Sequence, residues 1–297
     1  RLKSHGVNVY EEVISPWRFD VARNRSLELV PDCDICVCID LDEVLVSGWR
    51  SVLESVWDSD TTRLRYNYNW KLIDNKPIVN FYIEKIHSRY GYKWTHPVHE
   101  VLSYDGVEKF VTTDLITVNH FPDDSKSRGS YLPLLELSVK ENPSDDRNMH
   151  YLGREYMYYE KWQESIDTLK KHLELPSATW RDERCASMRF IGRCYEKIGN
   201  IEEARSWFDK AMHEAPYLRD PFMERALFEY RQENYFDVIL YCLRALDIDV
   251  HTKSYINEVF SWDNTVYDLL SISYFHINNV EKALFYVEKA IDMNPSD

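Results

Sequence analysis

The sequence contains no apolar run that could cross a membrane, and it carries comparatively little positive charge. A membrane-spanning helix needs roughly 18 or more consecutive apolar residues, and no stretch of the chain approaches that length. The 36 Lys and Arg residues are outnumbered by 50 Asp and Glu residues, which gives a net charge of −14. Such a balance argues against broad, sequence-independent binding to duplex nucleic acid or to anionic membranes. We therefore expect neither a membrane nor a nucleic acid as partner.

The cysteines do not have the spacing of a disulfide framework. Cys33, Cys36 and Cys38 crowd a single apolar run, and Cys33-x-x-Cys36 has no second pair or nearby histidine at zinc spacing. We expect reduced core thiols, which fit a reducing cytoplasm. The chain opens on charged and polar residues, not on methionine or an apolar segment. We therefore expect a trimmed start, no signal peptide and a cytoplasmic location.

Length and composition leave room for about two globular domains. Of the 297 residues, 44% are apolar and 29% are charged, as in chains with a packed core. Runs rich in Tyr, Val, Ile and Thr predict strands at residues 62–70, 80–89 and 109–121, with helices expected at residues 21–29 and 49–57. This alternation predicts an α/β domain over residues 1–141, with a mostly parallel sheet and an antiparallel addition.

Residues 142–297 are expected to be wholly helical and to repeat. One position of the pattern is occupied by Ser165, Ala204, Val238 and Ala283, at intervals of 39, 34 and 45 residues. A 34-residue interval is that of a tetratricopeptide unit, in which small residues let the second helix of each pair approach the first. The two longer intervals carry insertions. The sequence thus predicts four stacked helical pairs with aromatic residues in their core; the alternative is four unrelated helical hairpins.

An aspartate pair, Asp40 and Asp42, follows the apolar run at residues 35–39. We interpret the run as a buried parallel strand whose carboxyl end lies where open α/β sheets bind ligands. At strand spacing the two side chains share one face, and their charges would repel each other without a cation between them. Such oxygen ligands suit Mg²⁺ or Mn²⁺, with substrate phosphates completing the shell. The alternative is that both residues cap the helix expected after Ser47.

Three further segments could serve the same site. Arg23 and Asn24 open a helix, where a cation can face a phosphate or a sugar hydroxyl. His99 and Glu100 lie in a turn-rich segment beside aromatic residues and suit acid–base chemistry. His120 ends a strand-like run, as a metal ligand delivered by a strand end would.

Lys126 and Arg128 follow in a loop at residues 123–130. A mobile basic loop is a suitable cover for a diphosphate leaving group. Taken one at a time, these residues have simpler interpretations. Arg23, Lys126 and Arg128 could be surface residues. His99 could be a structural hydrogen-bonding residue, and Glu100 could be a surface carboxylate.

Four motifs and the repeats, taken in order, carry a resemblance to a known family. The motifs are Ala22-Arg23-Asn24 after Trp17, Ile39-Asp40-Leu41-Asp42-Glu43, Val98-His99-Glu100 after Trp94, and His120. Together they resemble a family 2 glycosyltransferase of the Rossmann-like GT-A fold with a C-terminal tetratricopeptide domain. Bacterial and phage members of this type include peptide S-glycosyltransferases that modify bacteriocins. The family's opening strands, which grip the nucleotide base, should precede Val7, so we expect an N-terminally incomplete domain.

The resemblance implies a metal-dependent, inverting glycosyltransferase. It implies Mn²⁺ or Mg²⁺, a nucleotide-sugar donor, and a protein, peptide or glycan acceptor held by the repeats. The implied residues are Asp40, Asp42 and His120 for the metal; Glu100 and His99 for catalysis; and Arg23, Asn24, Asp40, Lys126 and Arg128 for the donor.

Two other functions stay open. One is a non-catalytic tetratricopeptide adaptor with a degenerate transferase domain, which the missing opening strands favour and the intact aspartate pair opposes. The other is a glycosyltransferase acting on modified phage DNA, which the acidic balance of the chain disfavours.

Overall fold

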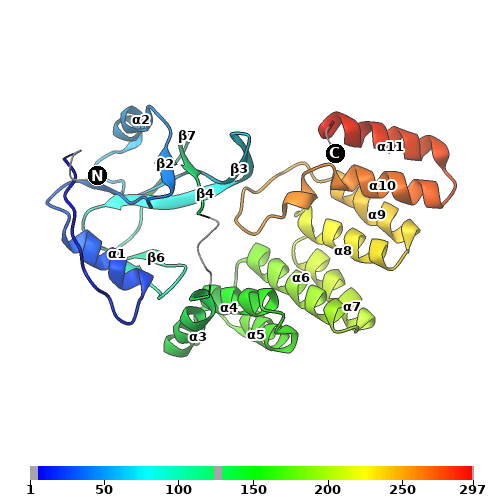
Figure 1. Ribbon diagram of the computed structural model, residues 1–297, viewed down its shortest axis with the longest axis horizontal. Helices are drawn as coiled ribbons and strands as arrows, with labels where there is room; N and C mark the ends of the chain where they lie inside the picture. The colour runs from blue at the N-terminus through cyan, green and yellow to red at the C-terminus, as the bar shows by residue number, and fades with distance from the viewer. Residues whose placement is uncertain (1–5, 124–128, 296–297) are drawn as a thin grey trace.

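The computed structural model describes residues 6–123 and 129–295, and it has a sheet-containing half and a helical half (Figure 1). The described residues from Tyr131 onward form helices and their connections. None of the helices in the described part of the chain combines the length and apolar character that a membrane crossing requires.

Five strands form the main sheet, in the order β1-β4-β3-β7-β2. Their bounds are β1 Ile35–Val37, β2 Glu43–Leu45, β3 Arg63–Ile73, β4 Lys76–Ser88 and β7 Phe110–His120. Of the four neighbouring pairs, β3–β7 is parallel and the other three are antiparallel. The prediction of a mostly parallel sheet is therefore wrong. β1, interpreted as a buried parallel strand, is an antiparallel edge strand, because an apolar run indicates burial but not strand direction.

Helix α2 (Trp49–Val56) packs on this sheet. Alternate residues of β3, Leu64, Tyr66 and Tyr68, are buried in one cluster with Leu53 of α2, as the two-residue period of a strand requires. Helix α1 (Phe19–Glu28) lies beside a smaller sheet of β5 (Tyr92–Thr95) and β6 (Val101–Tyr104). The amide of Asn24 fixes this contact, since it donates to the Trp94 carbonyl and accepts from the Trp94 N–H, both at 2.8 Å.

The helical half contains four consecutive helix pairs after α3 (Tyr131–Glu141). The pairs are α4 (Asp146–Tyr158) with α5 (Trp162–Glu174), α6 (Arg181–Lys197) with α7 (Ile201–Glu214), α8 (Asp220–Arg231) with α9 (Tyr235–Leu246), and α10 (Thr265–His276) with α11 (Val280–Met293). The pairs stack side by side along the chain (Figure 1). The predicted helical array is therefore confirmed.

Small residues permit the close approach of the two helices within a pair. Ser165, Ala204, Val238 and Ala283 are all buried. A Cβ atom added to Gly153 would lie 2.5 Å from the Leu169 side chain, and one added to Gly192 would lie 2.7 Å from the Phe208 ring. Neither separation is compatible with close packing. The small residues that recur in the sequence are therefore the ones that set the distance between the two helices of a pair.

The two halves meet through a packed junction. Val98, in the turn after β5, is buried with Leu135 of α3 and with Tyr151 and Leu152 of α4. In the same turn His99 stacks on Tyr151, with ring centroids 4.1 Å apart. This turn thus belongs to the interface with the first repeat.

We predict that a fragment ending at Glu141 aggregates. Removing α4 would expose Val98, Leu132 and Leu135, which lie against it in the full chain, and exposed apolar patches of this kind drive association. Size-exclusion chromatography and thermal melting of the fragment would test this. A monomeric fragment with a cooperative melt would contradict the prediction.

Candidate functional site

Strand pairing brings Asp42 and His120 together. β2 runs antiparallel to β7 with Glu43 opposite His120, and the Phe121 N–H donates to the Asp42 carbonyl at 2.7 Å. As a result, Asp42 Oδ2 lies 3.8 Å from His120 Nε2. Two of the three predicted metal ligands are therefore neighbours.

The other ring nitrogen of His120 is anchored. His120 Nδ1 lies 3.0 Å from the Trp70 carbonyl oxygen, and a carbonyl can only accept, so Nδ1 carries the proton. The imidazole also stacks on the Trp70 ring, with centroids 4.6 Å apart. Nε2 is then the ring atom that faces Asp42, and a cation held between the two side chains would have one nitrogen and one oxygen ligand.

Asp40 has different partners. It accepts two hydrogen bonds from Arg23 Nη2, at 2.9 and 3.0 Å, and one from Lys85 Nζ at 2.8 Å. Burial alone would raise the pKa of Asp40, but Lys85 and Arg23 outweigh it and hold the pKa at about 2. Two protein cations thus already balance this carboxylate. The predicted metal site therefore rests mainly on Asp42 and His120.

A buried layer beneath the aspartates was not predicted. Glu43 is buried and accepts from Lys85 Nζ and from the Tyr68 hydroxyl, both at 2.8 Å. Its second oxygen accepts from the Asp40 N–H at 2.9 Å. Lys85 follows Ile83 and Glu84 on β4. A lysine in the middle of a largely apolar strand is the sequence feature that indicates a buried acidic partner.

Glu100 is also bound by an arginine. Its carboxylate accepts from Arg23 Nε, and the guanidinium carbon of Arg23 lies 4.8 Å from the centre of the Trp94 ring. Arg23 therefore joins both predicted acidic groups. Asn24 is engaged with the Trp94 backbone, and His99 stacks on Tyr151 at the junction. Lys126 and Arg128 lie outside the described residues.

The first helices of the repeats carry a second polar region. Glu183, Arg189 and Arg193 of α6 and Asp220 of α8 face the segment that connects α9 to α10. We call these four residues the repeat face. Figure 1 shows this connecting segment, in orange, reaching from α9 toward α6. It falls in the longer of the two insertions expected from the repeat spacing.

A buried histidine pair lies next to the repeat face. The Ser187 hydroxyl lies 2.7 Å from His150 Nδ1 and 2.9 Å from His172 Nδ1. Among the described residues, Asp146, His172 and Glu183 form the one group with three potential metal-ligand atoms within 4.8 Å of one another. Glu183 already accepts from the Tyr255 hydroxyl. Burial lowers the pKa of His150 to about 3. His150 is therefore neutral, and a buried, hydrogen-bonded pair of this kind supports packing.

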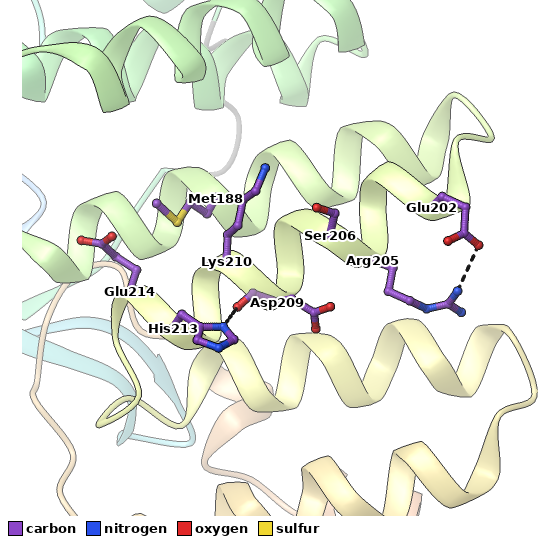
Figure 2. A pocket seen from close by; sticks show the side chains of 8 residues that line it. All are labelled: Met188, Glu202, Arg205, Ser206, Asp209, Lys210, His213 and Glu214. Atoms are coloured by element: carbon purple, nitrogen blue, oxygen red, sulfur yellow. Dashed lines mark hydrogen bonds and ion pairs between the residues drawn. The ribbon is translucent and has the colours of Figure 1, made fainter.

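A pocket of about 600 Å³ lies along α7 and contains none of the predicted site residues. Figure 2 shows its lining, which is mostly charged. The charges bind one another: Arg205 pairs with Glu202 at 3.2 Å, and Asp209 pairs with Arg225 at 2.9 Å. These pairs leave the pocket with no chemistry that points to a ligand.

Comparison with known proteins identifies the repeats. A tetratricopeptide repeat family model matches residues 190–216 and 265–297. The chain therefore contains tetratricopeptide repeats. The matched residues lie in the helical half, so the glycosyltransferase resemblance of the first half remains a prediction. No curated protein matches the chain.

Similar solved structures cover a little over half of the chain. MamA from Desulfovibrio magneticus RS-1, residues 41 to the end, is 14% identical, covering 57% of this chain and 86% of its own, with a TM-score of 0.44. The pilF structure from Pseudomonas aeruginosa is 12% identical, covering 56% and 68%, with a TM-score of 0.43. YrrB, described as a TPR protein with an unusual peptide-binding site, is 15% identical, covering 57% and 78%, with a TM-score of 0.41.

We predict that Lys85→Met destabilises the chain by roughly 3 kcal/mol, because it leaves Glu43 and Asp40 without their shared cation in a buried site. Urea unfolding at pH 7 would measure the change. Lys109→Met is the control, since Lys109 pairs with Asp60 on the surface of the same half and its loss should have little effect. Equal changes in the free energy of unfolding for the two substitutions would show that the Lys85 ion pairs stabilise the chain no more than a surface ion pair does.

Proposed function

We propose that the chain binds a peptide segment of a protein partner through its tetratricopeptide repeats. The observation that carries the proposal is the repeat face, where Glu183, Arg189, Arg193 and Asp220 all bind groups of a chain segment that is neither helix nor strand. Stacked helix pairs form extended surfaces of this kind. This is the adaptor function that the sequence left open.

The polar groups of the repeat face suit a peptide. Arg189 Nη2 donates to a backbone carbonyl at 3.0 Å, and Asp220 Oδ1 accepts from a backbone N–H at 2.5 Å. Contacts to main-chain groups supply affinity for an extended peptide independently of its side chains, and neighbouring side-chain sites add specificity.

A displayed peptide library selected on the full chain would test the proposal. Selected peptides should lose at least about tenfold in affinity for Arg193→Gln, because one charge-assisted contact contributes roughly 1.5–3 kcal/mol. Arg231→Gln is the matched control, since Arg231 is an exposed α8 arginine paired with Glu196. The proposal fails if no peptide is selected, or if binding is indifferent to Arg193.

A second candidate function is metal-dependent transfer of a sugar from a nucleotide-sugar donor. It is supported by the 3.8 Å approach of Asp42 to His120, with Nδ1 of the histidine anchored on Trp70. An oxygen and an imidazole nitrogen can share Mn²⁺ or Mg²⁺, and the donor diphosphate would complete the shell. The metal would neutralise the nucleoside diphosphate as it leaves.

The remaining residues of this candidate are held by other side chains. Glu100 is the proposed base, and it could accept a proton only if Arg23 releases it, because Arg23 Nε now donates to this carboxylate. Arg23 and Lys85 hold Asp40 at the edge of the site. The turn before Glu100 packs on α4 of the first repeat. An acceptor held by the repeats would therefore lie near Glu100.

We predict that Asp42→Asn abolishes Mn²⁺-stimulated hydrolysis of nucleotide sugars, lowering the rate by at least about a hundredfold, because it removes a charged metal ligand. Turnover of a nucleotide-sugar panel with Mn²⁺ or EDTA would measure this. Asp114→Asn, at a β7 carboxylate that accepts from Tyr82, is the control. Undiminished turnover in Asp42→Asn would refute the metal role, and no turnover in the wild type would leave the chain a binding protein.

A further inference from the structure

The repeat face has an occupant from the chain itself. After α9 the chain leaves the repeat pattern and returns across the first helices of three repeats before η2 (Val259–Ser261) and α10. Residues 255–258 make the contacts, so we call Tyr255-Ile256-Asn257-Glu258 the resident segment. Its first two residues form a turn, which the Asn257 N–H closes by donating to the Ser254 carbonyl at 3.1 Å. Side-chain contacts and a few further backbone hydrogen bonds hold the turn against the helices.

Two of its side chains fill apolar or aromatic sites. Ile256 is buried at 6% exposure in a cluster with Met157 of α4 and Phe190 of α6. The Tyr255 ring stacks near Tyr151, with centroids 5.8 Å apart, and its hydroxyl donates to Glu183. The repeat face thus recognises an aromatic hydroxyl followed by an aliphatic side chain.

The other end of the resident segment is held by charge. The Glu258 carboxylate accepts from Arg193 at 2.6 Å and from Arg189 at 3.2 Å. Burial raises the pKa of Glu258, but the two arginines outweigh it and lower the pKa. The Asp220 carboxylate accepts from the Glu258 N–H and, at 3.1 Å, from the Asn257 amide. An acidic residue two positions after the aliphatic one is therefore also recognised.

We infer that the resident segment occupies the partner-binding site, and that the partner is a peptide with the same chemistry. Such a peptide carries an aromatic hydroxyl, an aliphatic residue, an amide and a carboxylate in succession. This inference rests on the proposed function of the repeats and names both the partner chemistry and the competitor. The partner binds by displacing residues 255–258.

The surroundings of the resident segment suit displacement. Residues 248–254 before it have no regular structure. Lys253 makes a 3.8 Å ion pair with Asp114 and lies over the Tyr82 ring, both in the sheet half. The Ile248 carbonyl accepts from Arg219. Segments without regular secondary structure open at a lower free-energy cost than the helices they lie against. A tethered occupant nevertheless competes at high effective concentration, so it lowers the apparent affinity for a partner by the fraction of time for which the site is open.

The experiment uses a fluorescent peptide that copies residues 252–260 of this chain, Thr-Lys-Ser-Tyr-Ile-Asn-Glu-Val-Phe. We expect it to bind the full-length Ile256→Ala, Glu258→Gln variant at least about tenfold more tightly than the wild type, because the resident copy no longer competes. A peptide with Ser for Ile and Gln for Glu should not bind. Adding Arg193→Gln to the variant should abolish binding.

The matched control changes two exposed residues of the same insertion, Asp249→Asn and Val250→Ala. This control should bind the peptide as weakly as the wild type does. A folded Ile256→Ala, Glu258→Gln variant that binds neither peptide, or both equally, would overturn the inference. If this variant fails to melt cooperatively, Glu258→Gln alone replaces it. In the wild type, millimolar peptide should then accelerate amide exchange in residues 248–258, and unchanged exchange would overturn the inference.

The outcome also separates this inference from the proposed function. Peptides selected from a library that depend on Arg193, together with a copied peptide that does not bind, would overturn the inference alone. Loss of both kinds of binding would overturn the proposed function as well.

Discussion

A single guanidinium group joins three segments of the sheet half. Arg23 of α1 donates to Asp40 after β1 and to Glu100 after β5, and its guanidinium lies over the Trp94 ring. Three segments far apart in the sequence are thereby fixed to one another. A carboxylate left without such a partner in a half-buried site would cost several kcal/mol. Arg23 therefore determines where Asp40 and Glu100 lie, two of the three candidate acidic groups.

The turn that carries Glu100, which binds Arg23, also packs against the first repeat. Val98 is buried against α3 and α4, and the amide of Asn148 on α4 lies 2.8 Å from His96 Nδ1. His96 and His99 both have positive φ, 78° and 51°, a conformation that costs free energy in residues with a side chain and that tertiary contacts must stabilise. The candidate site and the first repeat are thus parts of one packed unit.

The sequence predicted the features that a residue's near neighbours in the chain determine, such as the helix repeats. The small residues Ala204 and Val238 lie at the helix contacts that their spacing required. Asp42 lies next to His120, but through an antiparallel register, because an apolar run carries no information about the direction of its neighbour. Asp40 binds Arg23 and Lys85 instead. Lys85 went unnoticed since its partners lie more than 40 residues away in sequence. The repeat spacing revealed the insertion before α10 but not where it folds.

The stability of the resident segment follows from how buried charges behave. The ion pairs of Glu258 with Arg189 and Arg193 gain Coulomb energy but lose hydration, so their net contribution is only a part of the Coulomb energy. Burial of Ile256 contributes about 2 kcal/mol. Ordering the four residues at about 1–2 kcal/mol each costs more than this burial contributes, so the Tyr255 ring contact and the backbone hydrogen bonds supply the rest. Charge therefore gives the repeat face its selectivity, while a small apolar contact and the tether decide whether the segment or another peptide occupies it.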